Sequence, residues 1–124
     1  MYKIVDLFSG AGGFGLGFKL ASPEYKIHCS LEIDKWAVDT LTANKDKDQQ
    51  IVQADIKKYT IPKIKELVPF TPEVIIGGPP CQGFSNANSK KNKKDPRNEL
   101  IYSFLKWVKV LKPKFFVIEN VTGI

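Results

Sequence analysis

Five short apolar runs alternate with helical patterns along the chain, and this alternation constrains the fold more than any other feature. The runs cover residues 3–8, 26–33, 50–56, 73–78 and 114–121. The clearest helical pattern comprises Leu100, Ile101, Phe104, Leu105, Val108 and Leu111. Strands that alternate with helices form mostly parallel sheets with helices on both faces. The sequence therefore predicts an α/β fold.

The composition excludes several classes of protein. The 124 residues suit about one domain, and 43% of them are hydrophobic, which is typical of a globular chain. Two cysteines, Cys29 and Cys81, give no disulfide framework, and we see no signal peptide, apolar membrane span or metal-ligand motif. We expect a cytoplasmic protein that does not enter a membrane.

The basic charge of the chain is concentrated in one segment. The net charge is +6, and residues 86–97 hold five basic side chains against Asp95 alone. The segment 82–98 is also long for an ordinary connection, which indicates a functional or disordered loop. A basic segment of this kind favours a polyanionic partner such as nucleic acid, although a solvated loop would look the same in isolation.

The first apolar run leads into a glycine-rich turn, "DLFSGAGGFGLGF". Gly10, Gly12 and Gly15 match the spacing of the dinucleotide-binding fingerprint, and Glu32 follows Gly10 by 22 residues. A carboxylate at that position can accept hydrogen bonds from the hydroxyls of an adenosine ribose. Asp55, at the end of the third run, could accept from the adenine amine or simply cap a helix. The motif predicts an adenosine ligand without saying which one.

Cys81 follows two glycines and two prolines in "GGPPCQGFS", directly after the fourth run. Pro79 and Pro80 fix the backbone and would present the thiol rigidly at the ligand-binding edge of the sheet. A buried inert cysteine needs no paired prolines, so we interpret Cys81 as a nucleophile. Cys29, in contrast, is expected to be inert, and His28 is interpreted as a strand residue and not a base.

Glu119 ends the fifth run, after four apolar residues. Burial there would favour the protonated carboxyl group, which could donate a hydrogen bond to a substrate base. A capping or salt-bridged glutamate is the alternative, and the neighbouring Cys81 makes the catalytic interpretation preferable. Asn120 is expected to tie adjacent loops together by hydrogen bonds to the backbone.

Taken in order, these residues resemble the cytosine carbon-5 DNA methyltransferases. "DLFSGAGGFGLGF" is similar to the first family motif, "GPPCQGFS" to the catalytic Pro-Cys motif, "DPRNEL" to the segment before the next helix, and "ENV" to the Glu-Asn-Val motif. The resemblance implies a Rossmann-like methyltransferase fold and S-adenosylmethionine as cofactor. The cofactor residues it implies are Phe8, Gly10, Gly12, Gly13, Glu32, Ile33, Asp55, Ile56 and Leu100.

The resemblance also implies a mechanism on a base flipped out of double-stranded DNA. Cys81 adds to carbon-6 of cytosine, Glu119 acts at ring nitrogen 3, and carbon-5 receives the methyl group. Ile33 departs from the tryptophan of several relatives, so the adenine would contact an aliphatic surface.

Residues 1–124 resemble the N-terminal part of the catalytic domain, without the later Gln-x-Arg-x-Arg motif and the target-recognition domain. The last apolar strand would leave an uncovered sheet edge. We therefore expect a sheet that is incomplete at its C-terminal side and a chain that needs a downstream segment or partner for activity. A bacterial restriction–modification role follows by analogy.

Three alternatives stay open from the sequence. The tRNA-methylating branch of the same family shares these motifs, and only the substrate separates the two. A non-catalytic half of a split enzyme would also keep the fold. A nicotinamide-dependent oxidoreductase fits the literal glycine fingerprint but has no use for "GPPCQGFS".

Overall fold

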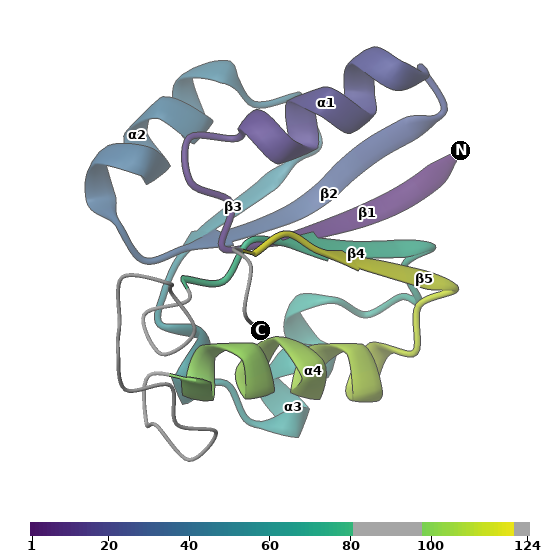
Figure 1. The fold of residues 1–124 in the computed structure, drawn as a ribbon. Helices are drawn as coiled ribbons and strands as arrows, with labels where there is room; N and C mark the ends of the chain where they lie inside the picture. The colour runs from purple at the N-terminus through teal and green to yellow at the C-terminus, as the bar shows by residue number, and fades with distance from the viewer. Residues whose placement is uncertain (81–97, 121–124) are drawn as a thin grey trace.

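The computed structural model describes residues 1–80 and 98–120. Figure 1 shows a central sheet between two layers of helices, with α1 and α2 on one face and α3 and α4 on the other. The elements are β1 (Tyr2–Leu7), α1 (Gly13–Ala21), β2 (Tyr25–Glu32), α2 (Lys35–Asn44), β3 (Gln50–Gln53), the 3₁₀ helix η1 (Ile56–Lys58), α3 (Ile61–Leu67), β4 (Val74–Gly77), α4 (Glu99–Leu111) and β5 (Phe115–Ile118).

The five strands form one parallel sheet in the order β3-β2-β1-β4-β5. The chain runs outward from β1 through β2 to β3, and then returns to the other side of β1 with β4 and β5. Each strand is connected to the next through a helix, and the direction in which strands are added reverses beside β1. Ligands of open α/β sheets bind at the carboxyl ends of the strands near such a reversal. The predicted fold class is therefore confirmed, and the topology indicates where a site should lie.

Alternate residues of the central strand β1 face opposite helical layers. Val5 and Leu7 belong to a large core under α3 and α4, which also contains the buried Phe104 and Trp107. Ile4 belongs to a smaller core on the α1 face. Because both faces of β1 are covered, its residues 4–7 are all buried, which explains its nearly continuous apolar sequence.

Local sequence signals set the helix boundaries. Asp34, a residue type that favours helix N-termini, caps α2 through a 2.9 Å hydrogen bond from the backbone N–H of Ala37. Thr60 caps α3, and Pro62 lies in its first turn. At the end of α4, Lys112 adopts a left-handed conformation with φ of 50°, and Pro113 follows. No helix within the described ranges is long and apolar enough to cross a membrane.

The structure corrects three details of the predicted elements. The third strand ends at Gln53, before the predicted boundary at residue 56, because Asp55 caps η1 instead of continuing the ladder. The fifth strand covers 115–118 and not 114–121. On α4, Leu105 is 38% exposed whereas Trp107 is fully buried, so the buried face is rotated from the one that the apolar spacing predicted.

Strand β5 lies at an edge of the sheet and is largely exposed. Phe115 is 70% exposed and Val117 is 40% exposed, and these side chains alternate with Phe116, whose ring lies 6.2 Å from that of Phe104 on α4. The prediction that this strand is buried is therefore wrong for the described residues. The prediction of an uncovered hydrophobic edge at the C-terminal side of the sheet is confirmed.

Candidate cofactor pocket and active site

A cavity of about 420 Å³ lies at the carboxyl ends of the strands, beside the reversal in strand order. Its volume falls in the range of small-molecule sites. Seven of the nine predicted cofactor residues line it: Phe8, Gly10, Glu32, Ile33, Asp55, Ile56 and Leu100. Five further residues complete the wall: Leu31, Ala54, Lys57, Gly78 and Pro80. These five residues were not predicted from the sequence, although all of them flank predicted site residues or strand ends.

The carboxylate of Glu32 connects the glycine turn to β2. Its Oε1 accepts a 2.9 Å hydrogen bond from the N–H of Gly10, and its Oε2 accepts from the N–H groups of Ile33 and Asp34 at 2.8 and 2.9 Å. A carboxylate offers about four acceptor positions. About one position therefore stays available for a hydroxyl group in the cavity, and the side chain is held rigidly for that contact.

The opposite wall of this cavity is formed around η1. Asp55 uses one carboxylate oxygen to accept a 3.0 Å hydrogen bond from the N–H of Lys57, so the capping role that the sequence left open is observed. Ile56 is buried, whereas Ile33 on the other side is 62% exposed. The chemistry of the donor set suits an adenosine: aliphatic side chains for a flat ring and carboxylates for the polar groups around it.

Gly12 and Gly13 lie outside this cavity. They line a second cavity of about 470 Å³ between α1 and α2. Gly12 is the residue before α1, where its φ of 99° requires glycine and an added Cβ would lie 2.9 Å from Leu41. In the structure both glycines therefore shape the turn, and their assignment as cofactor contacts stays a prediction.

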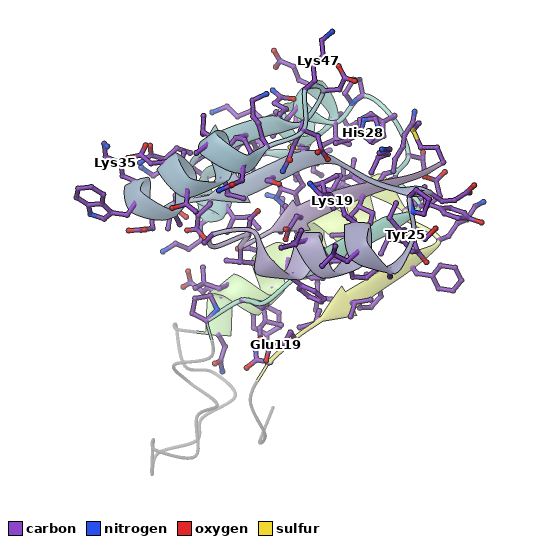
Figure 2. All side chains as sticks on the ribbon, turned by 90° about the horizontal axis from the view of Figure 1, so that it is seen from above. Lys19, Tyr25, His28, Lys35, Lys47 and Glu119 are labelled. Carbon is purple, nitrogen blue, oxygen red and sulfur yellow. The ribbon has the colours of Figure 1, made fainter. Side chains whose placement is uncertain are left out.

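Glu119 lies directly against the segment that leads to Cys81. Its backbone N–H donates to the carbonyl of Gly77 at 2.9 Å, and its Oε2 lies 3.1 Å from where a Cβ on Gly78 would be. Asn120 donates a 3.2 Å hydrogen bond to the carbonyl of Pro79, which confirms its predicted role. Figure 2 shows Glu119 beyond the end of β5.

The structure corrects the prediction that Glu119 is buried. Its side chain is exposed, and so are most residues of β5 before it. The buried environment that the sequence predicts for Glu119 is therefore not found among the described residues. Cys81, like the basic segment 86–97, lies outside the described residues, and its nucleophilic role stays a prediction.

Asp6 is a buried acid, 2% exposed, that was not among the residues predicted from the sequence. Its Oδ1 has no hydrogen-bond partner in the described structure, and an added Cβ on Gly15 would lie 3.1 Å from its Oδ2. Burial, together with the charge of Glu32, raises the pKa of Asp6 from 3.8 to about 7. The signal in the sequence is a single acid within an otherwise apolar strand.

The other reactive side chains fit structural roles. Cys29 is 1% exposed, and burial raises the pKa of its thiol to about 12, which keeps it protonated and inert. Burial lowers the pKa of His28, whose ring packs edge-on against Phe70. Both predictions from the sequence are consistent with these environments. No group of three metal-ligating side chains occurs among the residues that the structure describes.

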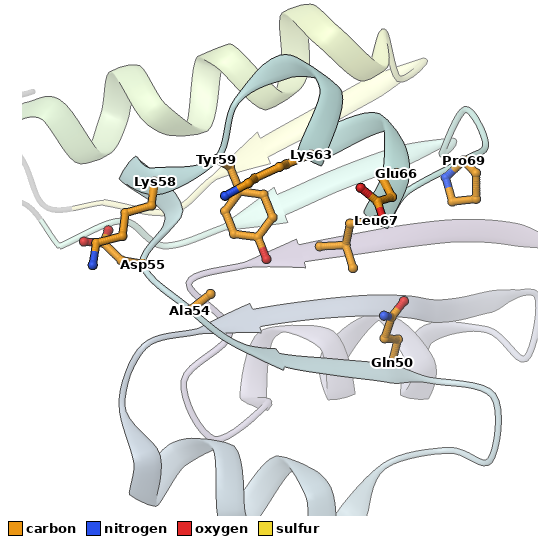
Figure 3. Close-up of a pocket in the computed structure, with 9 residues that line it drawn as sticks. All are labelled: Gln50, Ala54, Asp55, Lys58, Tyr59, Lys63, Glu66, Leu67 and Pro69. Carbon is orange, nitrogen blue, oxygen red and sulfur yellow. The ribbon is translucent and has the colours of Figure 1, made fainter.

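A larger cavity, about 840 Å³, lies beside the candidate cofactor pocket between β3 and α3 (Figure 3). The two cavities share Ala54 and Asp55. Lys58 and Lys63 line it together with Asp55 and Glu66, so opposite charges are balanced there. It contains none of the other predicted site residues. Volume alone therefore does not identify the functional site.

Comparison with protein families settles the relationship of this chain. The sequence model of the family described as "C-5 cytosine-specific DNA methylase" matches residues 2–124. The chain belongs to this family. Family membership favours the methyltransferase interpretation over a nicotinamide-dependent oxidoreductase.

Curated C-5 cytosine methylase relatives are similar over nearly the whole chain. Type II methyltransferase M.DdeI of Desulfomicrobium norvegicum is 44% identical over 98% of this chain and 28% of its own length. Type II methyltransferase M.AquIA of Picosynechococcus is 39% identical over 98% of this chain and 49% of its own length. The chain thus spans about a quarter to a half of these relatives.

Solved structures support the same fold. The S. pombe Dnmt2 methyltransferase aligns with all of this chain and 37% of its own, with a TM-score of 0.75 at 24% identity. The plantazolicin methyltransferase BpumL, solved in complex with SAH, aligns with 86% of the chain at a TM-score of 0.53. At these identities the likeness concerns the fold, which is that of a Rossmann-like methyltransferase.

Proposed function

We propose that this chain is the cofactor-binding and catalytic part of an S-adenosylmethionine-dependent DNA (cytosine-5-)-methyltransferase that serves a bacterial restriction–modification system in the cytoplasm. The observation that carries the proposal is the convergence of two features at one edge of the sheet. The pocket around Glu32 suits an adenosine, and Glu119 lies beside the Gly78–Pro80 segment that leads directly to Cys81.

In this proposal each residue has a separate chemical task. Glu32 binds a ribose hydroxyl, and the side chains of Ile33, Ile56 and Leu100 contact the adenine. The bound cofactor supplies an electrophilic methyl group for carbon-5 of cytosine. The thiolate of Cys81 adds to carbon-6, which makes carbon-5 nucleophilic, and Glu119 holds a proton at ring nitrogen 3. A base, such as a solvent water molecule, then takes the carbon-5 proton. The electron pair of that C–H bond re-forms the double bond between carbon-5 and carbon-6, so the bond between Cys81 and carbon-6 breaks and the thiolate is restored.

Exposed β5 supports a further part of the proposal. We infer that the remainder of the full-length protein, or a partner chain that contains a target-recognition domain, covers Phe115 and Val117 and pairs with the edge of β5. The 124 residues alone are then expected to bind cofactor weakly and to transfer no methyl group. Turnover by the purified 124-residue chain would contradict this part.

The experiment that tests the function measures transfer of labelled methyl groups from S-adenosylmethionine to duplex DNA and to bulk tRNA. The full-length protein, or the chain together with its downstream partner, is compared with Cys81→Ser, and Cys29→Ser is the matched control. Label on DNA that disappears only in Cys81→Ser supports the proposal. Label on tRNA alone would instead place the chain in the RNA-methylating branch, and no label on either would overturn both.

Glu32→Gln is expected to weaken cofactor binding by about tenfold or more, which corresponds to about 1.4 kcal/mol. In the wild-type protein, the N–H of Gly10 donates to one carboxylate oxygen and two further N–H groups donate to the other. Glutamine keeps only one oxygen, and its NH₂ group would face the N–H of Gly10. The glycine turn would therefore lose a hydrogen bond. Isothermal titration with S-adenosylhomocysteine measures the change. Glu24→Gln, on the exposed surface, is the control and should leave the affinity unchanged.

A further inference from the structure

Charge is divided unequally between the two helical layers. Residues 1–55, which include α1 and α2, contain six lysines and eight carboxylates. The described residues from 56 to 120, which include η1, α3 and α4, contain eight lysines and four carboxylates. The eight lysines form what we call the basic layer: Lys57, Lys58, Lys63, Lys65, Lys106, Lys109, Lys112 and Lys114.

The lysines of the basic layer are exposed, and no salt bridge neutralises them within the described residues, although Lys58 and Lys63 share a cavity with Asp55 and Glu66. All eight side chains are exposed, and none forms a salt bridge within the described ranges. The salt bridges of the described residues all belong to the other half of the chain, as in the pairs Lys19–Asp46 and Lys35–Asp39. Lys106 is held by a 2.8 Å hydrogen bond from its Nζ to the carbonyl of Tyr59.

The basic layer begins at the candidate cofactor pocket and extends away from it. Lys57 lines the pocket itself, while Lys109 and Lys112 lie at the far end of α4, near the start of β5. The 13 residues of α4 span about 20 Å at 1.5 Å per residue. That length matches about six base-pair steps at 3.4 Å each.

We propose that the basic layer binds the phosphate backbone of the nucleic acid substrate, several base pairs away from the target base. The inference rests on the proposed function, because a substrate at Cys81 and Glu119 would bring the same polyanion past η1. Lysines that lie singly along two helices, with no pocket around them, suit a repeating row of phosphates better than a small anion. This contact positions the duplex and carries no sequence preference.

The test compares two double variants of the full-length protein. Lys65→Gln with Lys109→Gln removes two charges from α3 and α4, whereas Lys26→Gln with Lys47→Gln removes two exposed charges from the opposite half. Figure 2 shows Lys47 at the surface of that half. Fluorescence anisotropy gives the affinity of each protein for duplexes of about 8 and about 30 base pairs over a range of KCl concentrations. Thermal unfolding checks that both variants stay folded.

For the long duplex, the basic-layer variant should reduce the slope of log affinity against log salt by roughly 1 to 2, and the control pair by much less. With the short duplex the two variants should become alike, because the flanking phosphates are absent. Equal slopes for both variants on the long duplex would overturn the inference. A second result would also overturn it: the basic-layer variant loses binding to vesicles of anionic lipid while its salt slope on the duplex is unchanged. That result would assign the basic layer to a membrane.

Methyl transfer at saturating duplex separates this inference from the proposed function. If the wild-type protein transfers methyl groups and the two variants have equal salt slopes, only the basic-layer inference fails. If the wild-type protein transfers no methyl group to DNA or tRNA, the proposed function fails, whatever the slopes are. The expected result is unchanged transfer at saturation in both variants.

Discussion

Gly77→Ala is expected to destabilise the protein by roughly 3 kcal/mol or more, at the upper end for an overpacked core. Gly77 is the last residue of β4 and is buried between two strands. A Cβ added there would lie 2.5 Å from the carbonyl oxygen of Leu7 and 2.8 Å from the ring of Phe104. The carbonyl belongs to the neighbouring backbone and cannot rotate away, so β1 and β4 would have to separate.

Gly17→Ala provides the matched control for this substitution. Nothing lies within 4 Å of an added Cβ at Gly17, which is an exposed position within α1. The same change should there stabilise the protein by about 0.5–1 kcal/mol, because alanine favours helix over glycine. Urea unfolding of the two variants measures both free energies. Similar values would show that β4 tolerates a side chain at Gly77 and would contradict the packing argument.

Asp6→Asn is expected to stabilise the protein by roughly 2–4 kcal/mol at pH 8 and to have little effect at pH 4. Burial and the charge of Glu32 raise the pKa of Asp6 from 3.8 to about 7. Between these values the folded state holds a proton that the unfolded state has released. Stability therefore falls as pH rises through this window, at up to about 1.4 kcal/mol per pH unit. Asparagine resembles the protonated carboxyl group and cannot ionise.

The measurement is the difference in unfolding free energy between wild type and Asp6→Asn from pH 4 to pH 8. Differences are needed because burial lowers the pKa of His28 from its usual 6.5, and this group therefore contributes the opposite slope just below that value. Glu66→Gln serves as the control, since Glu66 is exposed and does not act on Asp6 or His28. A constant difference across the range would show that Asp6 ionises normally in the folded protein.

Local chemistry made much of the fold predictable. Asp34 and Lys112-Pro113 mark helix ends through capping and proline geometry, which depend on a few neighbouring residues. The spacing from Gly10 to Glu32 predicted that both residues belong to one ligand site, and in the structure both line the same cavity. Each signal is local or reflects a repeated strand–turn–helix unit.

The missed features depend on packing between distant segments. Trp107 is fully buried because α4 faces the sheet and η1 together, and helical spacing alone does not give that rotation. The exposure of β5 depends on what lies beside the last strand, which its apolar sequence does not reveal. Asp6 was overlooked because a single acid in a strand looks the same whether it faces solvent or α1.

The central position of β1 has a consequence for synthesis on the ribosome. β1 pairs with β2 and with β4, and a hydrogen bond joins Lys3 to Glu73, 70 residues later. At about 5–20 residues per second, the chain needs several seconds to deliver that partner. Until β4 is available, the backbone groups on one edge of β1 stay unpaired. The nascent chain is most vulnerable to aggregation or to chaperone capture during this interval.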